Sequence, residues 1–297
     1  MNPRTWFLRI ALWLLALSLQ ACGGGGNDDG SATLRLVNAT QGYASLDLYT
    51  SDTKQISALA ASSASSYLTL AEGTTTLRLR QAGSATNAWS QDRSLAKDTA
   101  YTLVAYNNGT TLSTAILADS QSAPTSGYAA LRVFNTGGDI GTVDVYVTAP
   151  DVALADVSAT VSGLASATLG SYGEIAKGNY RIRVTGTGDK TDLRLDISSV
   201  DLADQQIATL ILQSTPGGVL ANGMLLNQKG SLTTYANANA RVRVVAAVAG
   251  NALVTASTSN GTLAGSLQSP SVGSYVLTPA TLAGLSLKVN GTALDTS

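Results

Sequence analysis

The 297-residue sequence contains no histidine and only one cysteine, Cys22. Without histidine, Ser-His-Asp and Cys-His arrangements for nucleophilic catalysis are excluded, and so are most transition-metal sites. A single cysteine cannot build a disulfide framework or a cysteine metal cluster. We therefore expect no catalytic residue, no metal ligand and no cofactor, and predict that the chain is not an enzyme.

Charged residues are also scarce, at 12% of the chain, with 18 basic and 19 acidic side chains. If the first 21 residues are removed, Arg4 and Arg9 go with them, which leaves 16 basic against 19 acidic residues and a net charge of −3. This balance offers no electrostatic footprint for nucleic acid. The only glutamates, Glu72 and Glu174, lie far apart and do not suggest the paired carboxylates of a glycosidase.

The amino terminus has the form of a signal peptide, with Arg4 and Arg9 beside a short apolar run that is too short to span a bilayer comfortably. The run leads to Leu19-Gln20-Ala21-Cys22, which resembles the lipobox of bacterial lipoproteins. The resemblance implies that residues 1–21 are removed and that Cys22 becomes an acylated first residue. The lipid bilayer is then a partner, since two or three acyl chains anchor a protein stably.

Gly23 follows Cys22, and the absence of aspartate there favours the outer membrane over the inner membrane of the bacterial envelope. Residues 22–31 are rich in glycine and predict a flexible tether. The alternative is an ordinary secretory signal with an incidental cysteine.

The rest of the chain is organised by a repeated pattern. Leu34–Asn38, followed by Leu46–Tyr49, returns 97 residues later as Leu131–Asn135 and Val143–Tyr146. A weaker copy begins at Val242. Each segment alternates apolar and polar residues, which is typical of a half-buried strand. We predict an all-β chain of tandem immunoglobulin-like antiparallel sandwiches: residues 32–123, residues 127–230 and a partial third repeat over 238–297.

The alternation also predicts which side chains are buried, because successive strand residues point to opposite faces. The expected core residues are Leu36, Leu48, Val133 and Val145. The expected exposed residues are Arg35, Asp47, Arg132 and Asp144, with Arg35 and Asp47 pairing across strands. The first two repeats are expected to fold independently.

The third repeat is predicted to be incomplete. It retains the opening strand, a strand after Ser274-Tyr275 and the Leu287–Val289 strand, but it lacks counterparts of Tyr101–Tyr106 and Ile116–Leu117. Such a sandwich leaves a sheet edge unpaired. Truncation of a longer protein, packing against the second repeat and a strand donated by a partner all remain open.

The pattern resembles the bacterial domain of unknown function 4397, on the strength of Arg132-Val133 and Val143-Asp144-Val145-Tyr146. The resemblance extends from residue 32 to the end as two full units and a partial third. It implies an extracytoplasmic, immunoglobulin-like β unit and no activity. The family's usual loop after the first strand resembles His-Ala-Ser-Pro, whereas this chain has Asn38-Ala39-Thr40 and Asn135-Thr136-Gly137.

Two classes of function remain: a structural or adhesive envelope protein, and a module that binds a glycan or peptide. Trp89 lies in a polar stretch and is the candidate ligand contact, whereas most tyrosines fall on strand patterns that indicate core or rim. Exposed aromatic residues gathered on one face of one repeat favour the binding module, and scattered ones favour the structural role. The expected partners are an envelope protein or a glycan.

Overall fold

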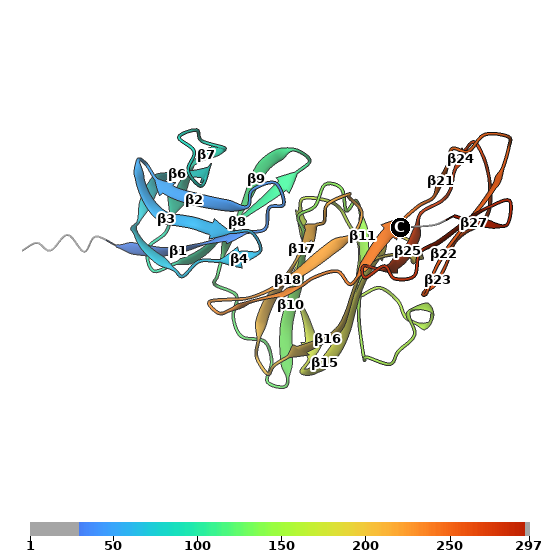
Figure 1. Cartoon of the computed structure of the whole chain (residues 1–297). Helices are drawn as coiled ribbons and strands as arrows, with labels where there is room; N and C mark the ends of the chain where they lie inside the picture. Colours follow the sequence, from blue (N-terminus) through green and yellow to red (C-terminus); the bar gives the residue numbers. More distant parts are fainter. Residues whose placement is uncertain (1–29, 295–297) are drawn as a thin grey trace, which may run out of the picture.

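The computed structural model describes residues 30–294, which form three β repeats in a row, from blue to red along the chain (Figure 1). Its only described helix is the short 3-10 turn η1 (Leu154–Asp156). The all-β class and the tandem sandwich arrangement are therefore confirmed. The signal peptide and Cys22 lie outside the described residues.

Repeat 1 consists of two sheets whose inner faces meet in a core that includes Leu34, Leu36, Leu46 and Leu48. One sheet contains β4 (Ser63–Ala64), β5 (Leu68–Ala71), β1 (Ser31–Asn38), β8 (Ala100–Asn108) and β9 (Thr111–Ala118). The other contains β3 (Thr53–Ala60), β2 (Ser45–Thr50), β6 (Gly73–Gln81) and β7 (Trp89–Leu95). The pairing of β1 with β8 is parallel, whereas the other pairings in the repeat are antiparallel.

Repeat 2 reproduces this plan, again with a parallel pair formed by β10 and β17. One sheet contains β13 (Thr168–Leu169), β14 (Gly173–Ala176), β10 (Tyr128–Asn135), β17 (Ile207–Ser214), β18 (Ala221–Asn227) and β19 (Leu232–Tyr235). The other contains β12 (Val161–Leu164), β11 (Val143–Thr148), β15 (Gly178–Gly186) and β16 (Asp189–Leu202). Within this repeat, residues 150–169 hold η1, β12 and β13.

Repeat 3 has a smaller set of strands. The opening segment pairs in two short ladders, β20 (Asn239–Val242) with β25 (Val276–Pro279) and β21 (Val245–Ala246) with β24 (Ser271–Val272). Its second sheet contains β23 (Gly261–Gln268), β22 (Leu253–Thr258), β26 (Ser286–Val289) and β27 (Thr292–Leu294). Within residues 30–294, no strand pair in this repeat corresponds to β8 and β9, as the sequence predicts.

The predicted core residues Leu36, Leu48, Val133 and Val145 are all buried, with at most 2% of their surface exposed. The prediction for the opposite faces is wrong: Arg35, Asp47 and Asp144 are buried, and Arg132 is half-buried. Arg35 and Asp47 also do not pair, because β1 and β2 belong to different sheets.

The burial of Asp47 follows from a bulge in the pairing of β2 with β3. There Ala58 adopts a positive φ of 50°, and its N–H donates to Asp47 Oδ1 at 2.7 Å. In repeat 2, the N–H of Gly163 donates to Asp144 Oδ1 at the same distance, beside a bulge between β11 and β12. The aspartate of the repeated motif is therefore a structural residue that satisfies a bulge N–H.

Candidate functional site between repeats 1 and 2

The first two repeats are joined by an apolar core that neither repeat forms alone. The outer face of the β1–β8–β9 sheet packs on the outer face of the β10–β17–β18 sheet. The rings of Tyr106 and Phe134 meet edge to face, with centroids 5.4 Å apart. The buried residues of this joint are Val37, Ala39, Val104, Tyr106, Leu117, Phe134, Ile211, Met224 and Leu226.

Equivalent positions of the two repeats face each other across the joint. Val37 pairs with Ala64 and Val104 in repeat 1, as Phe134 pairs with Leu169 and Ile211 in repeat 2. All six side chains belong to the joint cluster or pack against it. The same face is thus used twice, as in the interface of a symmetric dimer, and burying it favours a fixed arrangement of the two repeats.

Arg35 crosses this joint. It is 2% exposed, and its Nε donates to Thr102 Oγ1 in its own repeat at 2.8 Å. Its two terminal nitrogens donate to main-chain oxygens of repeat 2, to Gly230 O at 2.6 Å and to Asn227 O at 2.9 Å. Because a buried guanidinium requires such partners, this side chain fixes the position of the 227–230 turn.

Asp119 completes the network around Arg35. Its Oδ2 accepts hydrogen bonds from Thr102 Oγ1 at 2.6 Å and from the Tyr67 hydroxyl at 2.5 Å. Burial, together with the hydrogen bond to Asp119, raises the pKa of Tyr67 to about 12. The Arg35 guanidinium also lies 4.8 Å from the Tyr67 ring centroid. Tyr67 therefore serves as a neutral hydrogen-bond donor at neutral pH.

Repeat 2 carries the same arginine arrangement. Arg132 Nε donates to Thr209 Oγ1 at 3.0 Å, and its guanidinium lies 4.2 Å from the Tyr172 ring centroid. Burial lowers the pKa of Arg132, while Tyr172 and Asp119 act in the opposite direction. The repeated Arg-Thr-Tyr arrangement explains the arginine and tyrosine positions that the repeats share.

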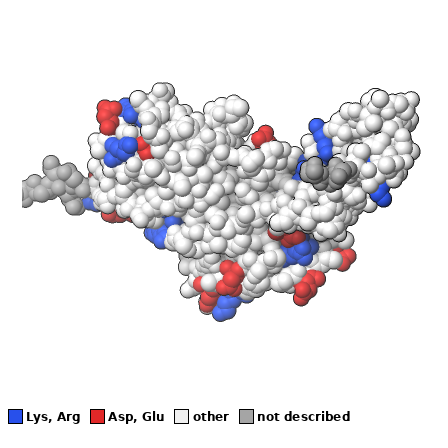
Figure 2. Space-filling model, viewed as in Figure 1, with Lys and Arg blue, Asp and Glu red and all other residues white. Residues whose placement is uncertain are grey.

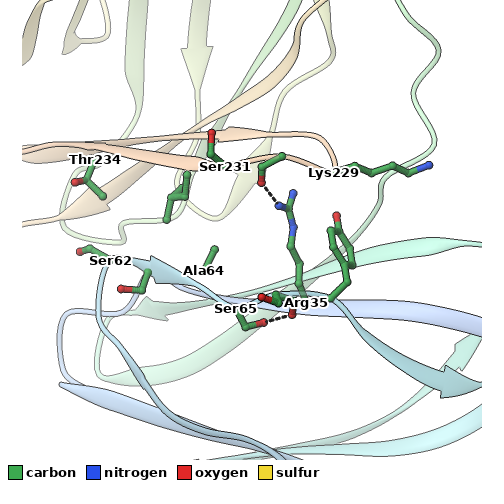
Figure 3. A pocket seen from close by; sticks show the side chains of 12 residues that line it. Arg35, Ser62, Ala64, Ser65, Lys229, Ser231 and Thr234 are labelled. Atoms are coloured by element: carbon green, nitrogen blue, oxygen red, sulfur yellow. Dashed lines mark hydrogen bonds between the residues drawn. The ribbon is translucent and has the colours of Figure 1, made fainter.

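A cleft of about 620 Å³ lies beside Arg35, between the two repeats (Figure 3). One wall comes from residues 62–67 and the other from residues 229–234. The walls carry the hydroxyl groups of Ser62, Ser65, Ser231 and Thr234. Ser62 already donates to Gln213 Oε1, and Ser65 donates to Ser66 O and accepts from Leu36 N, so Ser231 and Thr234 are the hydroxyls with donors left for a ligand. Lys229 stands at the rim with its ammonium directed away from the cleft (Figure 3), and Arg35 is already engaged by main-chain carbonyls.

Asn38 and Asn135, which end β1 and β10, have a structural role. Asn38 is buried, and its side-chain amide donates to Leu59 O at 3.1 Å, which links β1 to β3 of the opposite sheet. Asn135 donates in the same way to Leu164 O at 3.1 Å and to Gly141 O at 2.8 Å. These residues tie the two sheets of each sandwich together.

Trp89, the predicted ligand contact, begins β7 and does not line the cleft. Its half-buried side chain packs on the core of repeat 1, with the Arg93 guanidinium 6.0 Å from its ring centroid. Among the described residues, the exposed tyrosines are Tyr128 and Tyr275, which belong to different repeats. This scatter is the arrangement expected of the structural class of function.

In some hydrolases a Ser-x-x-Lys motif supplies a serine nucleophile and a lysine base. This motif occurs here at Ser51–Lys54 and at Ser94–Lys97. Lys54 Nζ lies 2.6 Å from Asp47 Oδ2. The hydrogen bond to Asp47 is the main cause that raises the pKa of Lys54, whereas a lysine base requires a lowered pKa. Ser51–Lys54 is therefore an unsuitable dyad.

Within residues 30–294, no three potential metal ligands of the His, Cys, Asp and Glu types come together. No helix of this part of the chain has the length and apolar character needed to cross a membrane.

The comparisons identify a domain of unknown function, DUF4397, over residues 32–146. The matched region covers repeat 1, β10 and the first part of β11, up to residue 146. Residues 32–146 are thus similar to this family, within an all-β tandem-repeat architecture. No curated protein matches the chain.

Two solved structures are similar to this chain at low identity. The multi-modular glycogen-degrading pneumococcal virulence factor SpuA is 7% identical, with a TM-score of 0.22, over 90% of this chain and 37% of the SpuA chain. The family CBM26 module CBMbc of Eubacterium rectale Amy13K, solved with maltoheptaose, is 12% identical, with a TM-score of 0.20, over 68% of this chain and 97% of the module. At these TM-scores neither neighbour carries an inference about a ligand.

Proposed function

We propose that this chain is a non-enzymatic lipoprotein of the bacterial cell envelope. Its acylated Cys22 is inserted in a membrane, the outer membrane being favoured by Gly23, and its repeats act as a stiff spacer with a role in protein interaction. The joint between repeats 1 and 2 is the observation that supports a spacer best. A shared apolar core crossed by Arg35 resists bending, unlike a free linker.

The surface charge agrees with this role. On the face seen in Figure 2, the basic and acidic side chains are few and interspersed, without an extended patch of one sign. This face therefore has no basic patch of the kind that binds nucleic acid. Contacts with envelope proteins would instead depend on shape and main-chain pairing.

Fractionation of cells tests the anchor. Cys22→Ser removes the thiol that would carry the lipid and leaves the described repeats unchanged. We expect the wild-type chain in the membrane fraction and the variant in the soluble fraction. A variant that stays in the membrane fraction as firmly as wild type would contradict the anchor.

Binding of a glycan or peptide is the second candidate function, and the hydroxyl-lined cleft beside Arg35 favours it. Titration calorimetry of the full chain with a panel of soluble oligosaccharides tests this role. Ser231→Leu places an apolar side chain on the cleft wall. We expect this variant to lose the heat of binding of any oligosaccharide that occupies the cleft. Binding that is unchanged in Ser231→Leu would place the ligand elsewhere.

A further inference from the structure

The carboxyl ends of four strands come together at one end of the joint between repeats 1 and 2. β1 runs parallel to β8, and β10 runs parallel to β17, so the strands of each pair end on the same side of their sheet. The segments at these ends line a cleft of about 610 Å³, which has none of its described lining residues in common with the cleft beside Arg35. We call it the loop cleft, and its lining includes Gln41, Tyr43, Asn107, Asp139, Ser214 and Pro216.

The walls of the loop cleft are held in place by contacts within and between the repeats. Gly138 of repeat 2 lies so near Gly109 of repeat 1 that a Cβ on Gly138 would be 3.0 Å from the Gly109 nitrogen. On the repeat 1 wall, Asn107 Oδ1 accepts hydrogen bonds from Gln41 N at 2.8 Å and from Gly42 N at 3.3 Å. Because these segments are positioned before a ligand arrives, binding costs little ordering of the chain.

Several polar groups of the loop cleft make no hydrogen bond within residues 30–294. Ser214 is only 9% exposed, yet its hydroxyl has no partner there. Gly137 leaves that hydroxyl its room, because a Cβ at Gly137 would collide with Ser214 Oγ. The Asp139 carboxylate and Asn107 Nδ2 are likewise unengaged in this part of the chain. Since a buried hydroxyl usually has a hydrogen-bond partner, these groups indicate a ligand with donors and acceptors of its own.

The composition of the lining favours a ligand without charge. The half-buried Tyr43 and the exposed Pro216 supply apolar surface beside the polar groups. The described residues that line the loop cleft include no lysine or arginine and a single carboxylate, that of Asp139, so an anionic ligand would be repelled. A saccharide fits this lining, because its hydroxyls both donate and accept hydrogen bonds and its C–H face packs on an aromatic ring.

We propose that the loop cleft binds a neutral saccharide. A sugar ring packs on Tyr43, and a sugar hydroxyl donates to the Asp139 carboxylate. Asn107 Nδ2 and Ser214 Oγ donate to sugar oxygens from the two walls. This inference rests on the second candidate function, glycan binding, and gives that role a site other than the cleft beside Arg35.

Calorimetry with the full chain tests this site, in a detergent that carries no sugar headgroup. The probes are neutral hexasaccharides of glucose, mannose, galactose and N-acetylglucosamine, with a galacturonic acid hexasaccharide and a lysine-containing tripeptide as charged comparators. We expect at least one neutral hexasaccharide to bind saturably. The galacturonic acid hexasaccharide should bind at least about fivefold more weakly than that one, because Asp139 repels its carboxylates. Acylation of Cys22 does not enter this measurement, which is therefore separate from the test of the anchor.

Matched variants show which groups are responsible. Asp139→Leu removes the acceptor, and we expect about tenfold weaker binding, whereas Asp139→Asn keeps a planar acceptor and most of the affinity. Tyr43→Leu keeps an apolar side chain on the core of repeat 1 but removes the ring, so binding should weaken about fivefold, whereas Tyr43→Phe should bind like wild type. Ser231→Leu, in the cleft beside Arg35, should also bind like wild type. Because Asp139 is exposed, Asp139→Leu keeps the test decisive if Tyr43→Leu does not fold.

Three results would each overturn the proposal. The first is that no neutral hexasaccharide binds saturably, and the second is that a charged comparator binds more tightly than every neutral one. The third is that Asp139→Leu, or a folded Tyr43→Leu, binds as wild type does. If binding is instead lost in Ser231→Leu, the saccharide occupies the cleft beside Arg35, so the second candidate function survives and the site proposed here does not.

Discussion

Arg35 of repeat 1 donates a hydrogen bond to the main-chain oxygen of Gly230 in repeat 2, across 195 positions of sequence and at 2.6 Å. The same guanidinium reaches Asn227 O at 2.9 Å and Thr102 Oγ1 at 2.8 Å. A side chain that alternation places on a solvent face thus holds two repeats together. Its burial adds to the shared apolar core in favouring a fixed arrangement of repeats 1 and 2.

Replacing Arg35 should destabilise the joined repeats. We expect Arg35→Met to cost about 2–4 kcal/mol, because the carbonyls of Asn227 and Gly230 lose a charged donor while partly shielded from water. Arg78→Met is the matched control, since Arg78 pairs with the exposed Asp52 and such a pair contributes at most about 1 kcal/mol. Urea unfolding of both variants measures the difference, and equal costs would argue against a structural role for Arg35.

The two neighbours Leu48 and Asp47 should both be sensitive to truncation, for different reasons. Alternation alone predicts about 2–5 kcal/mol for Leu48→Ala and less than about 1 kcal/mol for Asp47→Ala. The buried Asp47 instead bonds Lys54 and the N–H of Ala58, so we expect about 1–3 kcal/mol for Asp47→Ala. Chemical denaturation measures both costs, and a cost near zero for Asp47→Ala would contradict the bulge role.

Acid should weaken the fold through Asp47. Burial alone would raise the pKa of Asp47, but hydrogen bonds from Lys54 and the Ala58 N–H lower it below 3.8. A lowered pKa contributes stability above the unfolded value that is lost as the pH falls through the folded value. Asp47→Asn should therefore show a smaller loss of stability below about pH 4 than wild type. Parallel slopes of unfolding free energy against pH in the two proteins would contradict this.

Alkali should act through Tyr67. Its pKa is raised from 10.0 to about 12, so the folded state holds the proton more tightly than the unfolded state does. The corresponding stability is fully present below pH 10 and is lost as the pH rises toward 12. We expect Tyr67→Phe to be less stable than wild type at pH 8 and to lose this alkaline dependence. Thermal melting of both proteins from pH 8 to pH 11 measures how stability changes with pH. If Tyr67→Phe loses stability with rising pH as wild type does, Tyr67 is not the cause.

The sequence predicted the strands, the repeats and the inner core because a period of two is a local signal. It did not predict burial of Arg35, since alternation shows that a strand has two faces and does not show what covers the second. A further signal was present: Leu103–Tyr106 and Leu210–Leu212 are continuous apolar runs, which are typical of strands covered on both faces. The burial of Asp47 depends on a bulge, which the alternating pattern does not contain.

The distance between repeats 1 and 2 tests the spacer most directly. Spin labels at Ser84→Cys and Thr187→Cys, in a Cys22→Ser background, occupy exposed turns of the two repeats. Pulsed electron resonance should give a single narrow distance distribution, which broadens when Phe134→Ser opens the joint. A distribution for the parent chain as broad as that of the Phe134→Ser variant would contradict a stiff joint between repeats 1 and 2.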